Sequence, residues 1–461
     1  MADGRNETIA ELRQIIVKLR ARVAELEMRL GQNSANSGKP PSSDAPSDRE
    51  SRAKPPPSGR PRGGQPGHKG HRRALIPPEQ VTSSYEHFPE ACRRCGSRLP
   101  KTPCAEPLRH QVIEVPEVRP DVTEHRLHDG CCVNCGTVTR ASLPTDVPAG
   151  MCGPRLVALI SLLTGAYKLS RRQATTFLSD VLGIRMSLGA LSESEKGISE
   201  ALAEPVQAAL EYACREPVKH IDATGWRESN ESRSLWTIAT ASVTVFAITL
   251  DGSREYLQGL LTCVRGILVT DRAPQFGFWA MDHRQICWAH LLRKFTAFAE
   301  DNCPDVAHIG EQLLRLGHLL FHDWHCFRDG TMSRAELRRR SVLIRACTEN
   351  YLRNGVALQR RGVSGSCEDM LAHREALWTF IDTPRVEPTN NHAERELRGF
   401  VLWRKKCFGS QSERGTRFAE RVMTAVHTLR KQGRHVLSFL TAAAESRLRP
   451  QAALSLLPTT R

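Results

Sequence analysis

Hydrophobic residues in the first 31 positions recur at alternating steps of three and four. The repeat consists of Ile9, Leu12, Ile16, Leu19, Val23, Leu26 and Leu30. This spacing keeps one apolar seam of a helix facing a second helix. We therefore expect residues 1–31 to form a coiled-coil helix that dimerises the chain. An amphipathic helix that packs on its own chain is the alternative.

This pattern is absent from residues 32–78, which are rich in proline, serine and basic side chains. Between Arg49 and Arg73 there are eight lysines or arginines and one acid, Glu50. A charged segment with few apolar residues cannot bury enough surface to fold alone. These residues are predicted to form a disordered basic linker, which is also a candidate for contact with phosphates.

Helical spacing returns between residues 150 and 215, beginning with Leu156, Leu159, Ile160 and Leu163. A helix over Ser170–Leu182, a turn at Gly183 and a second helix from Ser187 would match a helix-turn-helix, a motif that reads DNA. Two ordinary packed helices joined at a glycine are the alternative.

Strand-like segments follow within residues 216–435. A short apolar segment ends at Asp222, residues 235–250 predict two strands, and residues 266–270 predict a strand that is followed by Asp271. Residues from about 291 to 385 read as helices, and residues 436–461 are predicted to form a C-terminal helix and tail. The fold class predicted from these patterns is multidomain α/β.

Composition narrows the range of partners. The chain has 461 residues, 65 of them Lys or Arg and 50 Asp or Glu, which gives a formal net charge of +15. Such an excess attracts polyanions. No apolar run approaches the ~20 residues that a membrane span needs, and charged residues interrupt the region where a signal peptide would lie. We expect a cytoplasmic protein without a membrane partner.

Two of the cysteine pairs have metal-ligand spacing. Cys92 and Cys95 form one CxxC motif, Cys132 and Cys135 form another, and a glycine follows each. Two such turns supply four thiolates for a structural Zn²⁺ ion, so residues 79–145 are predicted to form a zinc-ribbon DNA-binding module. Alternating apolar residues over 111–126 predict a β-hairpin between the pairs. A redox role for the pairs is the alternative.

Two aspartates, Asp222 and Asp271, are each predicted at the carboxyl end of a strand. Carboxylates gathered at one sheet edge suit a hard divalent cation. An aspartate after a strand is also a common turn residue, so these two alone do not establish a metal site.

A third carboxylate, Glu394, lies near the start of a predicted helix for which Asn391 is the expected cap. It falls at the edge of the stripe that is predicted to be buried, which consists of Ala393, Leu397, Phe400 and Val401. Glu396 is predicted to face solvent, and Glu387 lies before the helix. Glu394 could also serve as the capping-box partner of Asn391.

Basic residues follow Glu394 on the same helix. The candidates for contact with nucleic acid are Arg395, Arg398, Arg404, Lys405 and Lys406. Cations beside a carboxylate site suit a phosphodiester substrate, whereas a solvated basic face is the ordinary interpretation of such a run.

Six motifs, which follow one another along the chain, resemble motifs of the insertion-sequence-66 family of bacterial transposases. They are Asn33–Asp44 (NSANSGKPPSSD), Gly63–Gly70 (GGQPGHKG), the two CxxC pairs, Asp222–Arg227 (DATGWR), Cys287–Arg293 (CWAHLLR) and Glu387–Arg395 (EPTNNHAER) with the basic residues beyond it. The resemblance covers nearly the whole chain.

The resemblance implies a ribonuclease-H-like catalytic core over residues 216–435 with a helical insertion. Asp222, Asp271 and Glu394 would form its acidic triad and hold two Mg²⁺ ions, for which Mn²⁺ can substitute. The implied activity is Mg²⁺-dependent cleavage and strand transfer of DNA. The implied partners are double-stranded DNA, as transposon ends and target, further copies of the chain in a homodimer or higher oligomer, and accessory proteins of the same element.

The resemblance also implies a nucleoid-associated protein, and a decayed or domesticated transposase that only binds DNA through its zinc ribbon is the alternative. The sequence departs from the family pattern at Ala223, where glutamate is usual, and from Arg272 to Gln275, where glycine and an aromatic residue are usual. Arg272 would add bulk and charge beside the metal ions. Cys287 and His290 have no second ligand pair, so we interpret them as core and active-site-lining residues.

Overall fold

The structure is a computed structural model that describes residues 74–449 and 454–458. The predicted coiled coil at residues 1–31 and residues 32–73 of the predicted linker lie outside this range. The described residues belong to two compact units, which divide at residue 120. Each unit is therefore considered by itself.

The smaller unit contains the first CxxC pair and the short 3₁₀ helix η2 (Pro78–Gln80). The hairpin predicted over residues 111–126 is wrong, because these described residues form no strand. Pro116 and Pro120 interrupt the alternating segment, and proline removes a backbone donor that a strand ladder needs.

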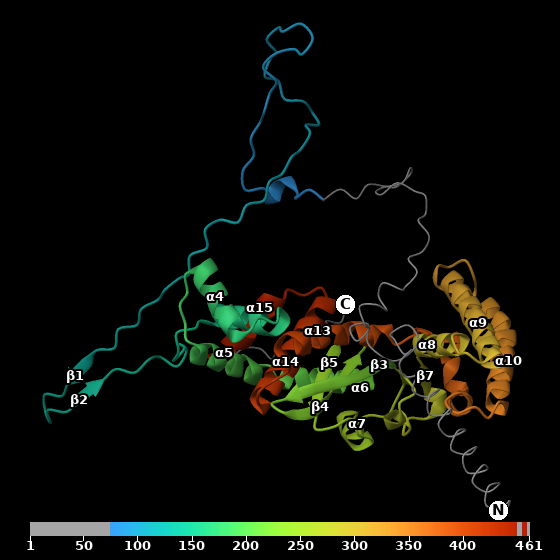
Figure 1. Ribbon diagram of the computed structural model, residues 1–461. Helices are drawn as coiled ribbons and strands as arrows, with labels where there is room; N and C mark the ends of the chain where they lie inside the picture. Colours follow the sequence, from blue (N-terminus) through green and yellow to red (C-terminus); the bar gives the residue numbers. More distant parts are fainter. Residues whose placement is uncertain (1–73, 450–453, 459–461) are drawn as a thin grey trace, which may run out of the picture. The chain divides into compact units, whose positions relative to one another are not determined.

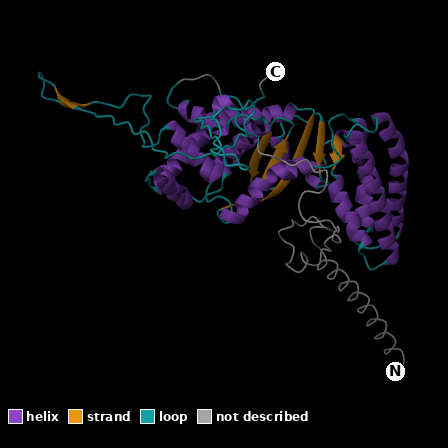
Figure 2. Cartoon of the chain, turned by 90° about the horizontal axis from the view of Figure 1, so that it is seen from above, coloured by secondary structure: helices purple, strands orange, loops and turns teal. Residues whose placement is uncertain are grey.

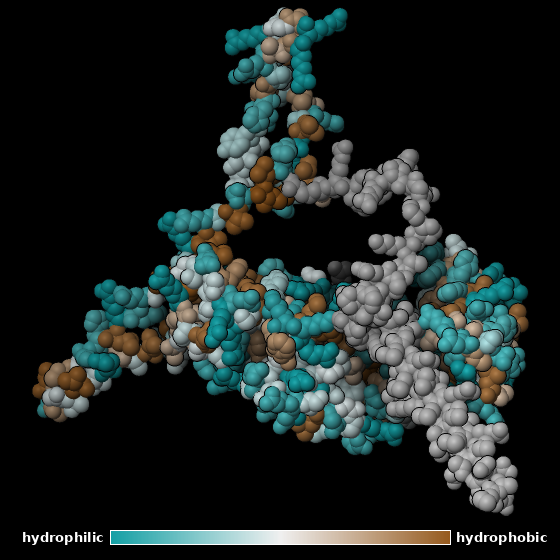
Figure 3. Space-filling view, viewed as in Figure 1, coloured by the Kyte–Doolittle hydropathy of each residue, from teal (hydrophilic) through white to brown (hydrophobic). Residues whose placement is uncertain are grey.

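A strand pair instead brackets the second CxxC motif, in the larger unit. Strands β1 (Asp129–Cys131) and β2 (Val138–Arg140) pair antiparallel, and Arg140 forms a bidentate ion pair with Asp129. Hydrophobic atoms gather at the tip of this hairpin (Figure 3), where Val133 and Val138 are exposed.

The region predicted to be helical begins the larger unit's globular part. Its elements are α3 (Pro154–Ser161), the π-helical turn η3 (Leu162–Ala166), α4 (Arg171–Leu182), α5 (Leu188–Ala201) and α6 (Ala203–Arg215). Ser170 and Gln173 form a capping box at the start of α4. Gly183 ends that helix with a left-handed φ of 68°, a conformation that glycine adopts without strain. The turn and the second helix thus lie where the pattern predicts them, while DNA reading stays a prediction.

A five-stranded mixed sheet forms the centre of the larger unit (Figures 1 and 2). Its strands are β3 (Val218–Glu228), β4 (Glu231–Ala239), β5 (Thr244–Thr249), β6 (Ile267–Thr270) and β7 (Arg284–Ile286). Their spatial order is β5-β4-β3-β6-β7, and β3, β4 and β5 pair antiparallel. Strands β6 and β7 continue the sheet in parallel with β3. The short helices α7 (Arg254–Leu260), η4 (Pro274–Phe276) and η5 (Met281–His283) connect these strands.

Helix α13 (Asn391–Cys407) packs on the sheet through an aromatic cluster. The Phe400 ring lies 5.4 Å from that of Trp226 on β3 and 4.7 Å from that of Phe246 on β5. Side chains alternate between the two faces of a strand, so the even-numbered residues of β3 face α13. This contact determines which residues of β3 face the candidate site.

Helix α14 (Glu413–Lys431) covers the open edge of the sheet. Backbone N–H groups of β5 donate to its side chains: Thr244 to Thr428 Oγ1 at 3.1 Å, Phe246 to Thr424 Oγ1 at 3.0 Å, and Ile248 to a Glu420 carboxylate oxygen. Two strand residues and four helix residues span a similar length, about 6–7 Å. Helix α14 therefore satisfies the backbone groups that an edge strand leaves free.

A group of helices leaves the sheet after β7 and returns at α13 (Figure 1, yellow to orange). It consists of α8 (Trp288–Ala299), α9 (Pro304–Arg328), α10 (Arg334–Ala357), α11 (Ser364–Ala372), η6 (Glu375–Leu377) and α12 (Thr379–Asp382). These helices bury an apolar cluster of their own, which continues onto Val269 and Ile286 of the sheet.

Helix α15 (Val436–Glu445), near the C-terminus, packs against α3. None of the described helices is long and apolar enough to cross a membrane.

Helices α8 and α9 approach so closely at Gly310 that a Cβ atom there would lie 2.1 Å from the backbone nitrogen of Ala299. We expect Gly310→Ala to lower the free energy of unfolding by ~2–3 kcal/mol, because backbone atoms must move apart. Gly365→Ala on α11 is the control, since its Cβ would meet no atom within 4 Å. Urea denaturation compares the two variants; equal midpoints would contradict the tight crossing.

Candidate active site

Asp222 lies inside strand β3, which corrects the expectation that it lies at the carboxyl end of a strand. Strand β3 continues to Glu228, and β4 pairs with it along this whole length. The parallel pairing with β6 stops at His220. The buried, apolar part of β3 that pairs with β6 ends just before Asp222. The sequence pattern reflects the end of this part and not the end of the strand.

Asp271 directly follows β6, as expected. His220 is paired with Val269, so the same register carried two residues further places Asp222 beside Asp271. Neighbouring residues of parallel strands point to the same face of the sheet. One Asp271 carboxylate oxygen accepts a hydrogen bond from the backbone nitrogen of Ala273 at 2.9 Å.

Asn390 positions the third carboxylate, that of Glu394, beside β3. It is the N-cap residue of α13, which corrects the expectation that Asn391 is the cap, and its side chain forms no capping hydrogen bond. Instead, its side-chain nitrogen donates to the carbonyl oxygen of Ile221 at 2.7 Å, and its backbone nitrogen donates to Cys287 Sγ at 3.1 Å. Its Oδ1 lies 3.3 Å from His220 Nδ1, and the residue is 1% exposed. The first turn of α13, with Glu394, is thereby fixed against β3.

The three carboxylates interact electrostatically. Burial, together with the negative charges of Glu394 and Asp271, raises the pKa of Asp222 to about 7. The Ala223 N–H group, 2.9 Å from Asp222 Oδ1, and the Arg293 guanidinium oppose this rise. A carboxyl group that is costly to ionise alone becomes a good ligand when a cation is beside it.

Arg293 and His290, both on α8, complete the surroundings of Glu394. Arg293 Nη2 lies 3.7 Å from Glu394 Oε2, and His290 Nδ1 lies 3.8 Å from Glu394 Oε1. Both Glu394 Oε1 and His290 Nδ1 are buried and have no hydrogen-bond partner within the described part of the chain. The sequence analysis did not identify Arg293, although it stands one helical turn after His290 in the CWAHLLR motif.

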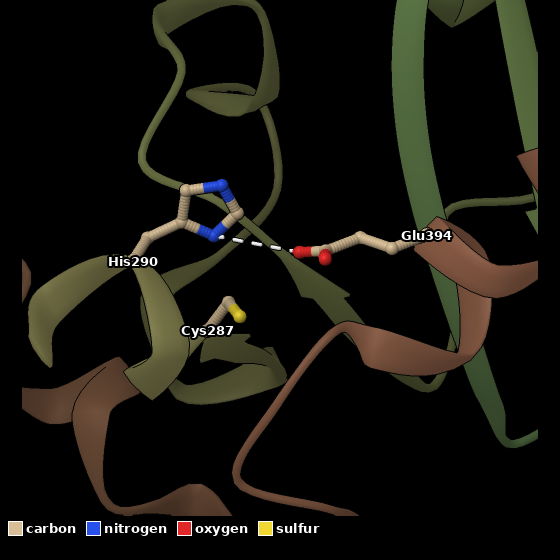
Figure 4. Close-up of side chains that lie close together, drawn as sticks. All are labelled: Cys287, His290 and Glu394. Atoms are coloured by element: carbon tan, nitrogen blue, oxygen red, sulfur yellow. Dashed lines mark ion pairs between the residues drawn. The ribbon is translucent and has the colours of Figure 1, made fainter. Parts of the chain in front are cut away.

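Cys287, His290 and Glu394 bring three possible ligand atoms within 4.8 Å of one another (Figure 4). Cys287 Sγ is fully buried, and burial raises the pKa of this thiol to about 11. Burial and Arg293 lower the pKa of His290. Cys287 and His290 line the site as interpreted, but the sequence analysis missed Glu394 as their third member because it is remote in the chain.

Arg272 has an ion-pair partner in the helical group. Its guanidinium forms an ion pair with Asp369 on α11. The same carboxylate also lies 3.3 Å from His373 Nδ1. The departure from the family pattern at this position is therefore matched by a partner within the helical group.

A model of the Transposase IS66 family matches residues 149–418, which is more than half of the chain. The chain belongs to this family. A second model, of a family of unknown function, matches residues 2–74. The chain is also similar to uncharacterized protein y4qI of Sinorhizobium fredii (strain NBRC 101917 / NGR234), at 27% identity over 158 residues. That match covers 34% of this chain and 29% of the relative.

In this IS66 family member, the side chains of Arg395, Arg398, Lys405 and Lys406 are exposed on α13. Arg404 differs, because its guanidinium donates to the carbonyl oxygen of Gly225 and to Thr224 Oγ1, 3.3 Å away, on β3. Four of the five candidate basic residues thus face solvent, and the fifth also fixes the helix to the sheet.

Glu396 does not face solvent, which corrects the expectation from the helical wheel. Its side chain is 17% exposed and contacts His427 Nδ1 at 2.6 Å and Lys431 Nζ at 3.1 Å, both on α14. Hydrogen bonds from His392 and His427 and the charge of Lys431 outweigh burial and hold the pKa of Glu396 far below its usual range. A helical wheel considers α13 alone, so it cannot predict that α14 packs over Glu396.

The two CxxC turns have the same backbone geometry. Gly96 and Gly136 both have φ near 72°, and their N–H groups donate to the carbonyl oxygens of Cys92 and Cys132 at 2.9 and 2.8 Å. Hydrogen bonding with Ser97 and Thr137 lowers the pKa of the second cysteine of each pair, Cys95 and Cys135. The pairs belong to different compact units, and their sharing of one zinc ion stays a prediction.

The raised pKa of Asp222 predicts how stability depends on pH in the metal-free protein. The folded state binds this proton more tightly than the unfolded state, so the stability contribution is present below pH ~4 and is lost as pH rises through about 7. Relative to Asp222→Asn, the free energy of unfolding should fall by ~2–4 kcal/mol between pH 4.5 and 8.

Denaturation in the presence of a chelator measures this difference. Asp282→Asn, at an exposed position in η5, is the matched control and should follow the parent protein at every pH. A constant difference between the parent protein and Asp222→Asn would show that Asp222 is not perturbed.

Proposed function

We propose that this protein is a DNA transposase that cuts and joins DNA strands with two Mg²⁺ ions held by Asp222, Asp271 and Glu394. One observation carries the proposal: Asp222 on β3 lies beside Asp271 at the end of β6, and Asn390 fixes the start of α13, with Glu394, against the same strand. The unpartnered Oε1 of Glu394 supports it, since a buried acceptor without a donor fits a cation. Oxygen ligands of this kind suit Mg²⁺, and also Mn²⁺.

The topology of the sheet supports a ribonuclease-H-like core. Three antiparallel strands, β3 to β5, are followed by β6 and β7 in parallel, in the order β5-β4-β3-β6-β7. Asp222 lies on the central strand, Asp271 follows the adjacent strand and Glu394 lies on the helix that packs on them. This arrangement can hold metal ions between rigid elements.

Bound Mg²⁺ ions would polarise the phosphodiester and lower the pKa of the attacking water. Water then forms the new bond to phosphorus while the bond to the 3′ oxygen breaks, which leaves a 3′-hydroxyl on the element's end. That hydroxyl attacks a phosphodiester of the target in the same way. Asp222, Asp271 and Glu394 stay unmodified, and Arg293 can turn from Glu394 to the phosphate oxygens.

The exposed basic residues of α13 are proposed to bind the DNA backbone. Arg395, Arg398, Lys405 and Lys406 continue along the helix that bears Glu394, and Arg404 holds this helix to β3. Phosphates that contact these side chains would place a strand near the carboxylates.

The remaining parts of the proposal concern assembly. The thiolates of Cys92, Cys95, Cys132 and Cys135 have the chemistry of a structural Zn²⁺ site, which would form a DNA-binding zinc ribbon. Residues 1–31 would pair two chains across two transposon ends. Accessory proteins of the element and association with the nucleoid complete the proposal.

The triad predicts the outcome of a cleavage assay. Asp222→Asn, Asp271→Asn and Glu394→Gln should each reduce Mg²⁺-dependent cleavage and strand transfer at least ~10³-fold, because each removes a charged metal ligand. Asp282→Asn and Glu387→Gln change exposed acids and should retain activity. DNA carrying the element's terminal repeats is the substrate, with accessory proteins added.

Two results would contradict parts of this proposal. Full activity in any triad variant would exclude that residue as a ligand. DNA binding by the parent protein without cleavage under every condition would instead favour a decayed transposase that only binds DNA.

Lys405→Ala combined with Lys406→Ala should weaken DNA binding about equally for all sequences. The slope of log K against log salt should become less steep by ~1–2, because two phosphate contacts are lost. Fluorescence anisotropy at several salt concentrations measures this slope. The control is Lys196→Ala, at an exposed position on α5, and equal slopes for both variants would place the DNA elsewhere.

A further inference from the structure

Cys287, His290 and Glu394 form a ligand set that the proposed Mg²⁺ chemistry does not use as a whole. Cys287 is the N-cap residue of α8, His290 lies in the first turn of α8, and Glu394 lies in the first turn of α13. Their ligand atoms all lie within 4.8 Å of one another, and they form the only such His/Cys/Asp/Glu group among the described residues. A close-up view shows His290 and Glu394 directed toward each other with Cys287 beside them (Figure 4).

We propose that these three residues bind a soft divalent cation of the Zn²⁺ class, and that this ion takes Glu394 away from the Mg²⁺ site. The proposal shares Glu394 with the proposed function but does not depend on DNA cleavage.

The donor atoms select the metal. One sulfur, one imidazole nitrogen and one carboxylate oxygen match the ligands that zinc accepts, whereas Mg²⁺ prefers oxygen in octahedral geometry. Zinc sites with three protein ligands leave a fourth position for water. His290 and Glu394 are 27% and 29% exposed, so solvent and the ion can reach the site from their side.

The site is fixed in position, and two of its three ligand atoms have no hydrogen-bond partner among the described residues. The backbone nitrogen of Cys287 donates to the Thr270 carbonyl oxygen at 2.8 Å, and Asn390 donates to the sulfur. His290 Nδ1 and Glu394 Oε1 are buried without a hydrogen-bond partner in the described residues. Buried polar atoms are nearly always partnered, and one ion between them would satisfy both. The positive charge of Arg293 also interacts with the Asp222 carboxyl group.

The sharing of Glu394 has a chemical consequence. Thiolate and imidazole ligands hold zinc more tightly than the oxygen ligands of the triad hold Mg²⁺. When zinc is bound, Glu394 is occupied and the Mg²⁺ site keeps only Asp222 and Asp271. The same glutamate would therefore act as a ligand in two exclusive states, and zinc would inhibit this protein.

Metal content of the full-length protein tests the proposal without DNA. The parent protein and the variants Cys287→Ser and His290→Gln are loaded with Zn²⁺, separated from free metal by gel filtration and analysed for zinc. The control is Cys367→Ser, which changes another fully buried cysteine that belongs to no ligand group in the described chain. Zinc in the CxxC pairs is common to all four proteins and cancels in the comparison.

We expect Cys287→Ser and His290→Gln each to contain one zinc fewer per chain than the parent protein, and Cys367→Ser to match the parent. In competition with a chromophoric chelator, the affinity of this site should fall at least ~100-fold in both variants, since each loses a direct ligand. With Co²⁺ as the probe, the spectrum of the parent minus that of Cys287→Ser should contain a thiolate charge-transfer band. Far-ultraviolet circular dichroism identifies any variant that fails to fold. If Cys287→Ser fails to fold, the comparison of zinc content uses His290→Gln alone.

Equal zinc content in the parent, Cys287→Ser and His290→Gln would overturn the proposal, as would a cobalt difference spectrum without the thiolate band. These readouts do not use DNA. A protein that binds this zinc but cuts no DNA would refute the proposed activity alone, and one that cuts DNA but does not bind this zinc would refute only the metal site.

Discussion

The hydrogen bonds of Asn390 are the constraint on which the candidate active site depends. This buried residue joins the centre of β3, the start of α8 and the start of α13 through Ile221, His220 and Cys287. These three segments carry or adjoin the residues of the site, and more than 160 positions separate Asn390 from Ile221 in the chain. A buried amide with all its groups bonded fixes distance and direction at once. The placement of Glu394 opposite Asp222 follows from this tie.

Two glutamates of helix α13 have opposite electrostatic surroundings although they are close in sequence. Glu394 interacts with the Asp222 carboxyl group and belongs to one ligand set with Cys287 and His290, whereas Glu396 is held by Lys431 and His427 on α14. Burial and the neighbouring carboxylates raise the pKa of Asp222, whereas hydrogen bonds from His392 and His427 and the charge of Lys431 lower that of Glu396 despite its burial. Burial alone would raise the pKa of both. The helix therefore keeps one acid as part of a structural ion cluster and leaves the other available for chemistry.

Local patterns in the sequence predicted the parts of the fold that depend on local forces. The enrichment of residues 235–250 in Val, Ile, Thr and Ala predicts two strands, which are β4 and β5, and the helix predicted between Ser170 and the turn at Gly183 is α4. Two of the errors involve distant partners. Asp222 was placed at a strand end because pairing with β4 beyond it is not visible locally, and Glu396 was assigned to solvent because α14 covers it. The apolar alternation over residues 111–126 was misleading, since two prolines prevent a ladder there. The catalytic candidates themselves followed from the family resemblance more than from spacing.

The helical group between Asp271 and Glu394 begins and ends at one place. The backbone nitrogen of Trp288, its first residue, donates to the carbonyl oxygen of Pro388 at 2.9 Å, just before α13 begins. Its indole nitrogen donates to Leu377 at 2.7 Å. When the two ends of a long inserted segment are held this close together, each residue added to the segment increases the entropic cost of closure only slightly. Evolution could therefore lengthen, shorten or exchange these helices, and with them any surface they present to a partner, while the carboxylates keep their spacing.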